Sequence, residues 1–228
     1  MEVLPPRIPG SQCLLENLWH SEGAVPAVLS QPPNFHSLKK VAAIVQRVRT
    51  GGDRALLRFA KQFDNLSAPI EVSREEMETE AAKIPADVRL AIRNAAKNIA
   101  KVAARQIPKH FDVEVVKGVM VEQRVEPLES VGCYVPGGRY PMVASAHMSI
   151  VTARVAGVQR IIACAPPFKG GPHPAIVAAM HFGGADEIYV LGGVQAVAAM
   201  ALGTESIAPV DMIVGPGNAY VAEAKRQL

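Results

Sequence analysis

Three polar residues stand at the ends of short apolar runs, each in a loop rich in glycine or proline. Tyr134 opens YVPGG, Gln195 closes LGGVQ and Asn218 closes GPGN. Glycines let a ligand approach the backbone, and a helix that follows such a loop exposes amides that favour phosphate. We therefore treat these three residues as candidates for binding a nucleotide, with a dinucleotide as the natural ligand.

Each candidate also has a simpler interpretation. Asn218 could only cap the helix that follows it, Gln195 could cap a helix or face solvent, and Tyr134 could be a core or rim aromatic. None of the loops reads G-x-G-x-x-G, and no acidic residue follows the first strand at the ribose-binding distance. An ordinary Rossmann fingerprint is therefore absent, and only the joint placement of the three residues favours a site.

Other reactive side chains give weaker signals. The six histidines lack the H-x-x-x-H or H-E-x-x-H spacing, so no complete local metal site is visible. His147 lies among small residues, His173 lies in a glycine-rich loop, and Lys169 beside two glycines could meet a phosphate. Cys133 and Cys164 fall in apolar runs, which predicts packing rather than nucleophilic catalysis.

The elements that must position the three candidates form a recurring unit. Apolar runs begin near positions 130, 160, 187 and 211, each followed by a glycine or proline loop and an alanine-rich segment. This spacing suits βα units, and strands that are apolar throughout indicate a sheet covered on both faces. We predict an α/β domain at 129–228 with a parallel, Rossmann-like sheet, whose strand ends create a crevice for ligands.

The preceding segment, 36–128, is predicted to be mainly helical. Gly51 and Gly52 separate two amphipathic patterns, Ser73 and Glu76 form a capping-box pair, and the clearest helix runs to about Gln106. Two β-branched runs around Lys117-Gly118 predict a hairpin. The first 35 residues are rich in proline and lack periodicity, so we expect a loosely ordered arm there.

Composition excludes several classes of protein. The net charge of +3 is too small and too dispersed to indicate nucleic acid, and the apolar stretches are far shorter than the roughly 20 residues of a spanning helix. Three cysteines without a C-x-x-C pair indicate a reducing compartment. We therefore expect a cytoplasmic protein that binds neither nucleic acid nor membrane.

Longer stretches resemble the histidinol dehydrogenase family in order and spacing: GGDRALLRFAKQFD, VGCYVPGGRYP, VAGVQRIIACAPP, ADEIYVLGGVQAVAAMALGTESI and VDMIVGPGNAYVAEAKRQL. The resemblance covers about 36–228. It implies a homodimeric, zinc-dependent enzyme of histidine biosynthesis that oxidises an alcohol substrate, histidinol, to the carboxylate through the aldehyde with NAD. By the same resemblance, Tyr134, Gln195 and Asn218 match the family's NAD-contacting positions.

The resemblance also raises expectations about what this chain lacks. The family's catalytic Glu-His pair and its zinc ligands would lie beyond Leu228, so we expect a catalytically incomplete fragment with an incomplete first domain, which does not hold zinc alone. The segment PMVASAHMSIVTA departs from biosynthetic members. This departure leaves open a paralogous branch that oxidises a sulfonated propanediol. A noncatalytic nucleotide-binding or dimerisation fragment is the remaining alternative.

Overall fold

The computed structural model describes residues 35–66, 69–137 and 140–228. The arm predicted at 1–35 lies outside the described residues, apart from its last position. Helix α3, Phe35–Asp64, contains a kink at Gly52, where φ is 49° and ψ is −140°. These angles suit glycine, because a side chain would be strained there. The double glycine therefore separates two helical halves, as the sequence predicted.

Two further helices follow in the segment predicted to be helical. Helix α4, Arg74–Ala82, begins with the predicted capping box. The Ser73 hydroxyl accepts the amide of Glu76 at 3.2 Å, and the Glu76 carboxylate accepts the amide of Ser73 at 2.8 Å. Helix α5, Ala86–Gln106, ends at the predicted residue. Local capping and periodicity therefore set these boundaries correctly.

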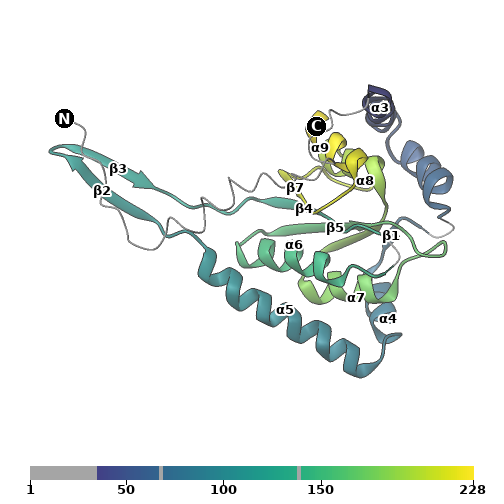
Figure 1. The fold of residues 1–228 in the computed structure, drawn as a ribbon, viewed down its shortest axis with the longest axis horizontal. Coiled ribbons are helices and arrows are strands. Elements are labelled where there is room, and N and C mark those ends of the chain that lie inside the picture. Colours follow the sequence, from purple (N-terminus) through teal and green to yellow (C-terminus); the bar gives the residue numbers. More distant parts are fainter. Residues whose placement is uncertain (1–34, 67–68, 138–139) are drawn as a thin grey trace, which may run out of the picture. The chain divides into compact units, whose positions relative to one another are not determined.

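The predicted hairpin consists of β2, Phe111–Val116, and β3, Val119–Gln123, paired antiparallel around Lys117-Gly118. All residues of both strands are exposed. The hairpin forms a sheet of its own and extends away from the larger sheet (Figure 1). The sequence pattern was therefore sufficient to predict this hairpin, which local pairing and its turn define.

The larger sheet has five strands in the order β1-β6-β5-β4-β7. Their bounds are Glu71–Val72 for β1, Ser130–Tyr134 for β4, Arg160–Ala165 for β5, Glu187–Val190 for β6 and Met212–Val214 for β7. Strands β4 to β7 pair in parallel, which confirms the predicted α/β class, whereas β1 pairs antiparallel with β6. The helical segment thus contributes an edge strand that the sequence did not indicate, and the domain boundary near 129 stays a prediction.

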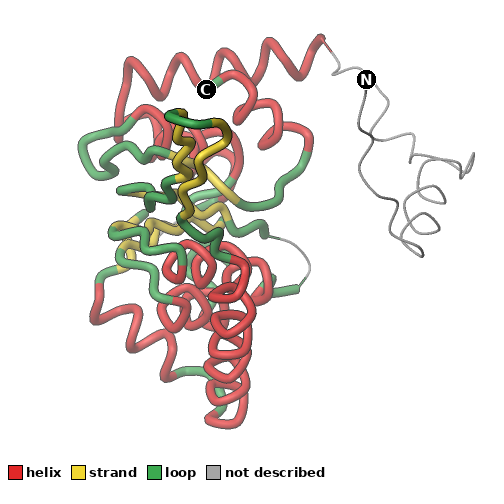
Figure 2. Tube along the Cα trace, turned by 90° about the vertical axis from the view of Figure 1, so that its left-hand side faces the viewer, coloured by secondary structure: helices red, strands yellow, loops and turns green. Residues whose placement is uncertain are grey.

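Helices cover both faces of this sheet (Figures 1 and 2). Helices α3, α8 and α9 pack together on one face, and α4, α5, α6 and α7 pack together on the other. The bounds of the helices not yet given are Val143–Val155 for α6, Pro174–Gly183 for α7, Gly193–Leu202 for α8 and Ala219–Gln227 for α9. Strands β4 and β5 are accordingly almost completely buried, as uniformly apolar runs require.

The loop after α8 closes onto the kink in α3. The Glu205 carboxylate accepts the amide of Asp53 at 2.7 Å, and the Ser206 hydroxyl donates to the Asp53 carboxylate. Glu205 therefore satisfies an amide at the start of the second half of α3, and its charge suits the positive end of a helix. The motif GTES, Gly203 to Ser206, thereby fastens the start of this half-helix to the end of α8.

No helix in the described part of the chain is long and apolar enough to span a membrane.

Candidate nucleotide-binding site

Three loops converge on Tyr134, the last residue of β4. Its hydroxyl accepts the backbone amide of Gly193, at the start of α8, at 3.0 Å. On its other side, Gly215 follows β7 and passes so close that a Cβ there would lie 2.0 Å from the Tyr134 carbonyl oxygen. With φ at 114°, Gly215 must be glycine on both counts. Tyr134 therefore links the loops that follow β4, β6 and β7.

Gln195 lies in the first turn of α8 and is only 2% exposed. Its Nε2 donates to the Oδ2 of Asp64 at 3.1 Å. Asp64 is the last residue of α3, and it also accepts a hydrogen bond from the backbone amide of Gly192. Burial raises the pKa of Asp64, although both hydrogen bonds act to lower it. The structure thus excludes the solvent-facing alternative for Gln195 and places a carboxylate beside it.

Asn218 caps α9, as its simpler interpretation predicted. Its Oδ1 accepts the amides of Tyr220 at 3.0 Å and Val221 at 3.1 Å. The neighbouring Lys225 donates from Nζ to the Gly215 carbonyl oxygen at 2.6 Å, and burial lowers the pKa of Lys225. The cap fixes the loop after β7 in place, while contact between Asn218 and a nucleotide stays a prediction.

The helix N-termini at this edge of the sheet are not equivalent. His173 caps α7 by accepting the amide of Ala175 at its Nδ1, and Asn218 caps α9. The N-cap residue of α6, Met142, makes no capping hydrogen bond, whereas at the start of α8 the Tyr134 hydroxyl accepts the amide of Gly193. Both helices begin where the chain leaves a parallel strand, so their positive ends lie at the ligand-binding edge. Of the two, the start of α6 is better suited to an anion, because the first amide of α8 is bound to Tyr134.

The other reactive candidates have structural surroundings. His147 is 1% exposed in α6, burial lowers its pKa, and its Nε2 has no hydrogen-bond partner in the part of the chain that the structure describes. The ring of His173 lies 4.8 Å from that of Phe168. Lys169 is exposed, with its Nζ 5.3 Å above the same Phe168 ring. His173 thus acts as a helix cap, and nothing in the described geometry connects His147 to the Tyr134 loops.

Cys133 and Cys164 are fully buried in neighbouring parallel strands. Burial raises the pKa of Cys133 to about 11 and also raises the pKa of Cys164. Both side chains are therefore protonated thiols at neutral pH, and a protonated thiol is a poor nucleophile. The structure confirms the prediction that they pack in the core.

A cavity of about 210 Å³ lies between the loops that follow β4 and β5. Its lining includes Tyr140, Met142, Phe168 and His173 together with prolines. The cavity adjoins the β4 loop through Pro136 and Gly137, although none of the three nucleotide candidates lines it. The lining is mostly apolar and aromatic, which suits a planar ring.

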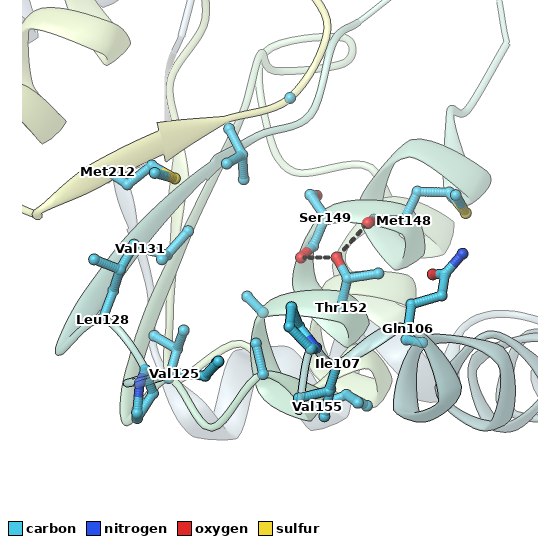
Figure 3. Close-up of a pocket in the computed structure, with 18 of the residues that line it drawn as sticks. Gln106, Ile107, Val125, Leu128, Val131, Met148, Ser149, Thr152, Val155 and Met212 are labelled. Atoms are coloured by element: carbon cyan, nitrogen blue, oxygen red, sulfur yellow. Dashed lines mark hydrogen bonds between the residues drawn. The ribbon is translucent and has the colours of Figure 1, made fainter. Parts of the chain in front are cut away.

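A larger cavity of about 740 Å³ lies between α5, α6 and β7 (Figure 3). Val131 and Met212 face Met148 and Thr152 across it. Two of its hydroxyls are engaged within α6, because Ser149 donates to the Ser145 carbonyl oxygen at 2.9 Å and Thr152 donates to that of Met148 at 2.6 Å. None of the three nucleotide candidates lines this cavity, and Glu126 is the only ionisable side chain among the described residues that line it. It therefore lacks the groups that redox chemistry or phosphate binding would need.

The described residues contain no group of three or more His, Cys, Asp or Glu side chains that could hold a metal ion. Sequence reasoning also missed Asp64, the carboxylate beside Gln195. The available signal was an acidic residue ending an amphipathic helix inside GGDRALLRFAKQFD. That signal does not show which later loop the carboxylate meets.

The chain is similar to known proteins over most of its length. The histidinol dehydrogenase family model matches residues 31–228. A histidinol dehydrogenase homolog from Shouchella clausii is 52% identical over 82% of this chain, and sulfopropanediol 3-dehydrogenase from Ruegeria pomeroyi is 47% identical over 82%. A crystal structure of histidinol dehydrogenase from Elizabethkingia anophelis matches 86% of this chain with 34% identity and a TM-score of 0.80.

The chain covers only part of each of these relatives. The chain spans 45% of the Shouchella clausii protein, 44% of the Ruegeria pomeroyi protein and 46% of the Elizabethkingia anophelis chain. It therefore spans less than half the length of the relatives it matches.

Proposed function

The chain belongs to the histidinol dehydrogenase family, and from that premise we propose that it supplies the NAD-binding part of an alcohol dehydrogenase. The proposed reaction is the oxidation of a small alcohol to a carboxylate through the aldehyde, with histidinol as the first candidate substrate. A homodimer in the cytoplasm belongs to the same proposal. The observation that carries it is the convergence of three strand-end loops on Tyr134.

The geometry of these loops fits a dinucleotide. The N-cap residue of α6 makes no side-chain capping hydrogen bond, so the first amides of this helix can meet the pyrophosphate. The cavity lined by Tyr140 and Phe168 has the apolar and aromatic lining that suits a planar ring. Bound NAD would supply the hydride acceptor, while this chain binds and orients it.

The roles of the three candidate residues follow from their contacts. Tyr134 holds the start of α8 through the amide of Gly193. Gln195 can contribute a carbonyl oxygen, because its Nε2 is already bound to Asp64. Asn218 holds the first turn of α9 and so fixes the loop after β7. We propose that the first and third residues mainly shape the crevice and that Gln195 contacts NAD directly.

Zinc enters the proposal only through the family. The described residues offer no cluster of ligands for it, so we assign no zinc ligand and no step that uses the metal to this chain. The residues that exchange protons with the alcohol are likewise not assigned.

The sulfopropanediol relative supports a second candidate substrate. The observation that favours it is the segment from Pro141 to Ala153, which departs from the biosynthetic pattern and forms most of α6. This helix begins directly after the β4 loop, so its first turn adjoins the proposed site. Substrate choice between histidinol and the sulfonated diol therefore remains part of the proposal.

Calorimetric titration of the purified 228-residue chain with NAD⁺ tests the proposal. We expect binding that Gln195→Ala weakens about tenfold, the effect of losing one well-placed polar contact. Gln123→Ala on the exposed hairpin is the matched control, because it removes the same side chain far from the crevice. A folded chain that does not bind NAD⁺ would overturn the proposal in favour of a noncatalytic interaction role.

A second assay distinguishes the substrates. NADH formation is measured with Zn²⁺, NAD⁺ and either histidinol or sulfopropanediol. Turnover of one alcohol and not the other identifies the substrate. Oxidation of neither alcohol, by a chain that binds NAD⁺, would limit the function of this chain to cofactor binding.

A further inference from the structure

Asp64 reaches the candidate site from a distant part of the sequence. It ends α3, yet its carboxylate accepts Nε2 of Gln195, 131 residues later, at 3.1 Å. The backbone amide of Gly192 donates to the same carboxylate. One half-buried side chain thus holds both the loop after β6 and the polar group at the start of α8.

The chemistry of this contact fixes the orientation of the Gln195 amide. An ionised carboxylate only accepts hydrogen bonds, so it selects the NH₂ end of the amide. The carbonyl oxygen, Oε1, then points elsewhere, and it lies 3.1 Å from where a Cβ of Gly193 would stand. Because Gln195 is 2% exposed, the surrounding packing leaves little room for another rotamer.

We propose that Asp64 is a positioning residue of the nucleotide site, which makes Gln195 an acceptor for donor groups of the bound dinucleotide. Such donors are the ribose hydroxyls and the carboxamide NH₂ of the nicotinamide. This inference rests on the proposed function, since it names how that site selects its ligand. A nucleotide that offers only acceptors at this position would gain nothing from Gln195.

A purely structural tie is the competing explanation, and α3 carries a suitable control for it. Asp53, at the other end of the same half-helix, accepts a hydrogen bond from the Ser206 hydroxyl. It binds a loop beyond the far end of α8, away from Gln195 and Tyr134. Asp53→Asn therefore changes a carboxylate in a comparable tie without entering the crevice.

The test compares NAD⁺ affinity and melting temperature in the parent chain, Asp64→Asn and Asp53→Asn. An asparagine at position 64 offers both a donor and an acceptor, so the Gln195 amide loses its single orientation. We expect Asp64→Asn to weaken NAD⁺ binding about tenfold, and Asp53→Asn to leave it within about twofold. Both variants should fold, because asparagine preserves the shape of aspartate.

The exchanged pair Asp64→Asn with Gln195→Glu provides the rescue. It keeps the net charge, lets the new amide at position 64 donate to a carboxylate at position 195, and restores an acceptor at position 195. We expect the pair to regain affinity to within about threefold of the parent chain. If the contact between Asp64 and Gln195 only stabilised the fold, Asp64→Asn would lower the melting temperature but not the NAD⁺ affinity. The exchanged pair would then restore the melting temperature alone.

The outcomes separate the two proposals. If the parent chain binds NAD⁺ and Asp64→Asn binds equally well, the positioning role is wrong and the proposed function stands. If Asp53→Asn loses as much affinity as Asp64→Asn, the effect is one of general stability and the positioning role is again wrong. A folded parent chain that does not bind NAD⁺ overturns both.

Discussion

The second half of α3 is hydrogen-bonded at both of its ends to residues at or near the ends of α8. We call these two sets of contacts the first and second tie, and they differ in kind. At its start, Asp53 meets Glu205 and Ser206 beyond the end of α8. At its end, Asp64 meets Gln195 at the start of α8. The first tie satisfies helix amides next to a kink, whereas the second orients a side chain in the candidate site.

Electrostatics separate the two carboxylates further. Burial acts to raise the pKa of Asp53, but hydrogen bonds from Ser206 and Thr204 outweigh it, and the pKa lies below its ordinary value. For Asp64 burial outweighs the hydrogen bonds from Gly192 and Gln195, and the pKa is raised. Hydrogen bonds from two side chains and one backbone group thus outweigh the burial of Asp53, whereas those from Gly192 and Gln195 do not outweigh the burial of Asp64.

The largest expected loss of stability comes from a change that loosens the whole second half of α3. Leu56 lies between the two ties, is fully buried, and belongs to the hydrophobic core. Replacing it with alanine should lower the free energy of unfolding by about 3 kcal/mol, through lost burial and a cavity. Urea denaturation measures the change. A loss below about 1 kcal/mol would show that this half-helix is not anchored through its core face.

Breaking the first tie alone should have a smaller effect. Asp53→Ala removes the acceptor of the Ser206 hydroxyl and should cost about 1–2 kcal/mol. A double-mutant cycle with Ser206→Ala assigns the part that belongs to this pair, and we expect a coupling of about 1 kcal/mol. Additive losses would indicate that the two side chains do not stabilise each other.

A conservative change at the hub of the site should cost less still. Tyr134→Phe keeps the ring and removes only the hydroxyl that accepts the Gly193 amide at 3.0 Å. We expect a loss of about 1 kcal/mol, because one hydrogen bond is removed and its amide donor loses its partner. Denaturation and NAD⁺ titration are both measured. Unchanged values in both would remove Tyr134 as the link between the β4 and β6 loops.

The smallest expected effect is on the pH dependence of stability, which should have opposite signs for Asp53→Asn and Asp64→Asn. Because the pKa of Asp53 is lowered, its charge stabilises the fold above the unfolded-state pKa, and that contribution is lost as pH falls through the folded-state pKa. The advantage of the parent chain over Asp53→Asn should therefore shrink on acidification. For Asp64, whose pKa is raised, ionisation opposes folding, so the parent chain should gain relative to Asp64→Asn as pH falls.

Urea denaturation of the three proteins from neutral pH to well below the ordinary aspartate pKa of 3.8 checks both signs. The same sign for both variants would mean that the two ends are electrostatically alike. The comparison between a structural tie and a site tie would then lose its physical basis.

Much of this fold was readable from the sequence because its signals are local. Ser73 and Glu76 are three residues apart, so their reciprocal hydrogen bonds mark the start of α4 in the sequence itself. The uniformly apolar runs predicted buried parallel strands for the same reason. The edge strand β1 was missed because two residues carry no detectable period, and pairing with β6 alone makes them a strand.

Only part of the candidate site could be predicted from the sequence. Strand-end position singled out Tyr134, Gln195 and Asn218 as candidates, and the capping role of Asn218 follows from its place before a helix. The sequence could not indicate the carboxylate that meets Gln195. Nor could it predict that Gln195 would be buried, since no local pattern distinguishes a buried polar residue in an alanine-rich helix from an exposed one.

The sequence by itself therefore determined the order of helices and strands apart from β1, the glycine kink in α3, the parallel sheet class and the family. These features depend on residues within a few positions of one another or on long ordered stretches of motif. Only the tertiary structure decided that Asp53 meets Ser206 and that Asp64 meets Gln195, across separations of 153 and 131 residues. The packing of α3 along α8 brings those pairs together, and no local preference of either partner specifies the other.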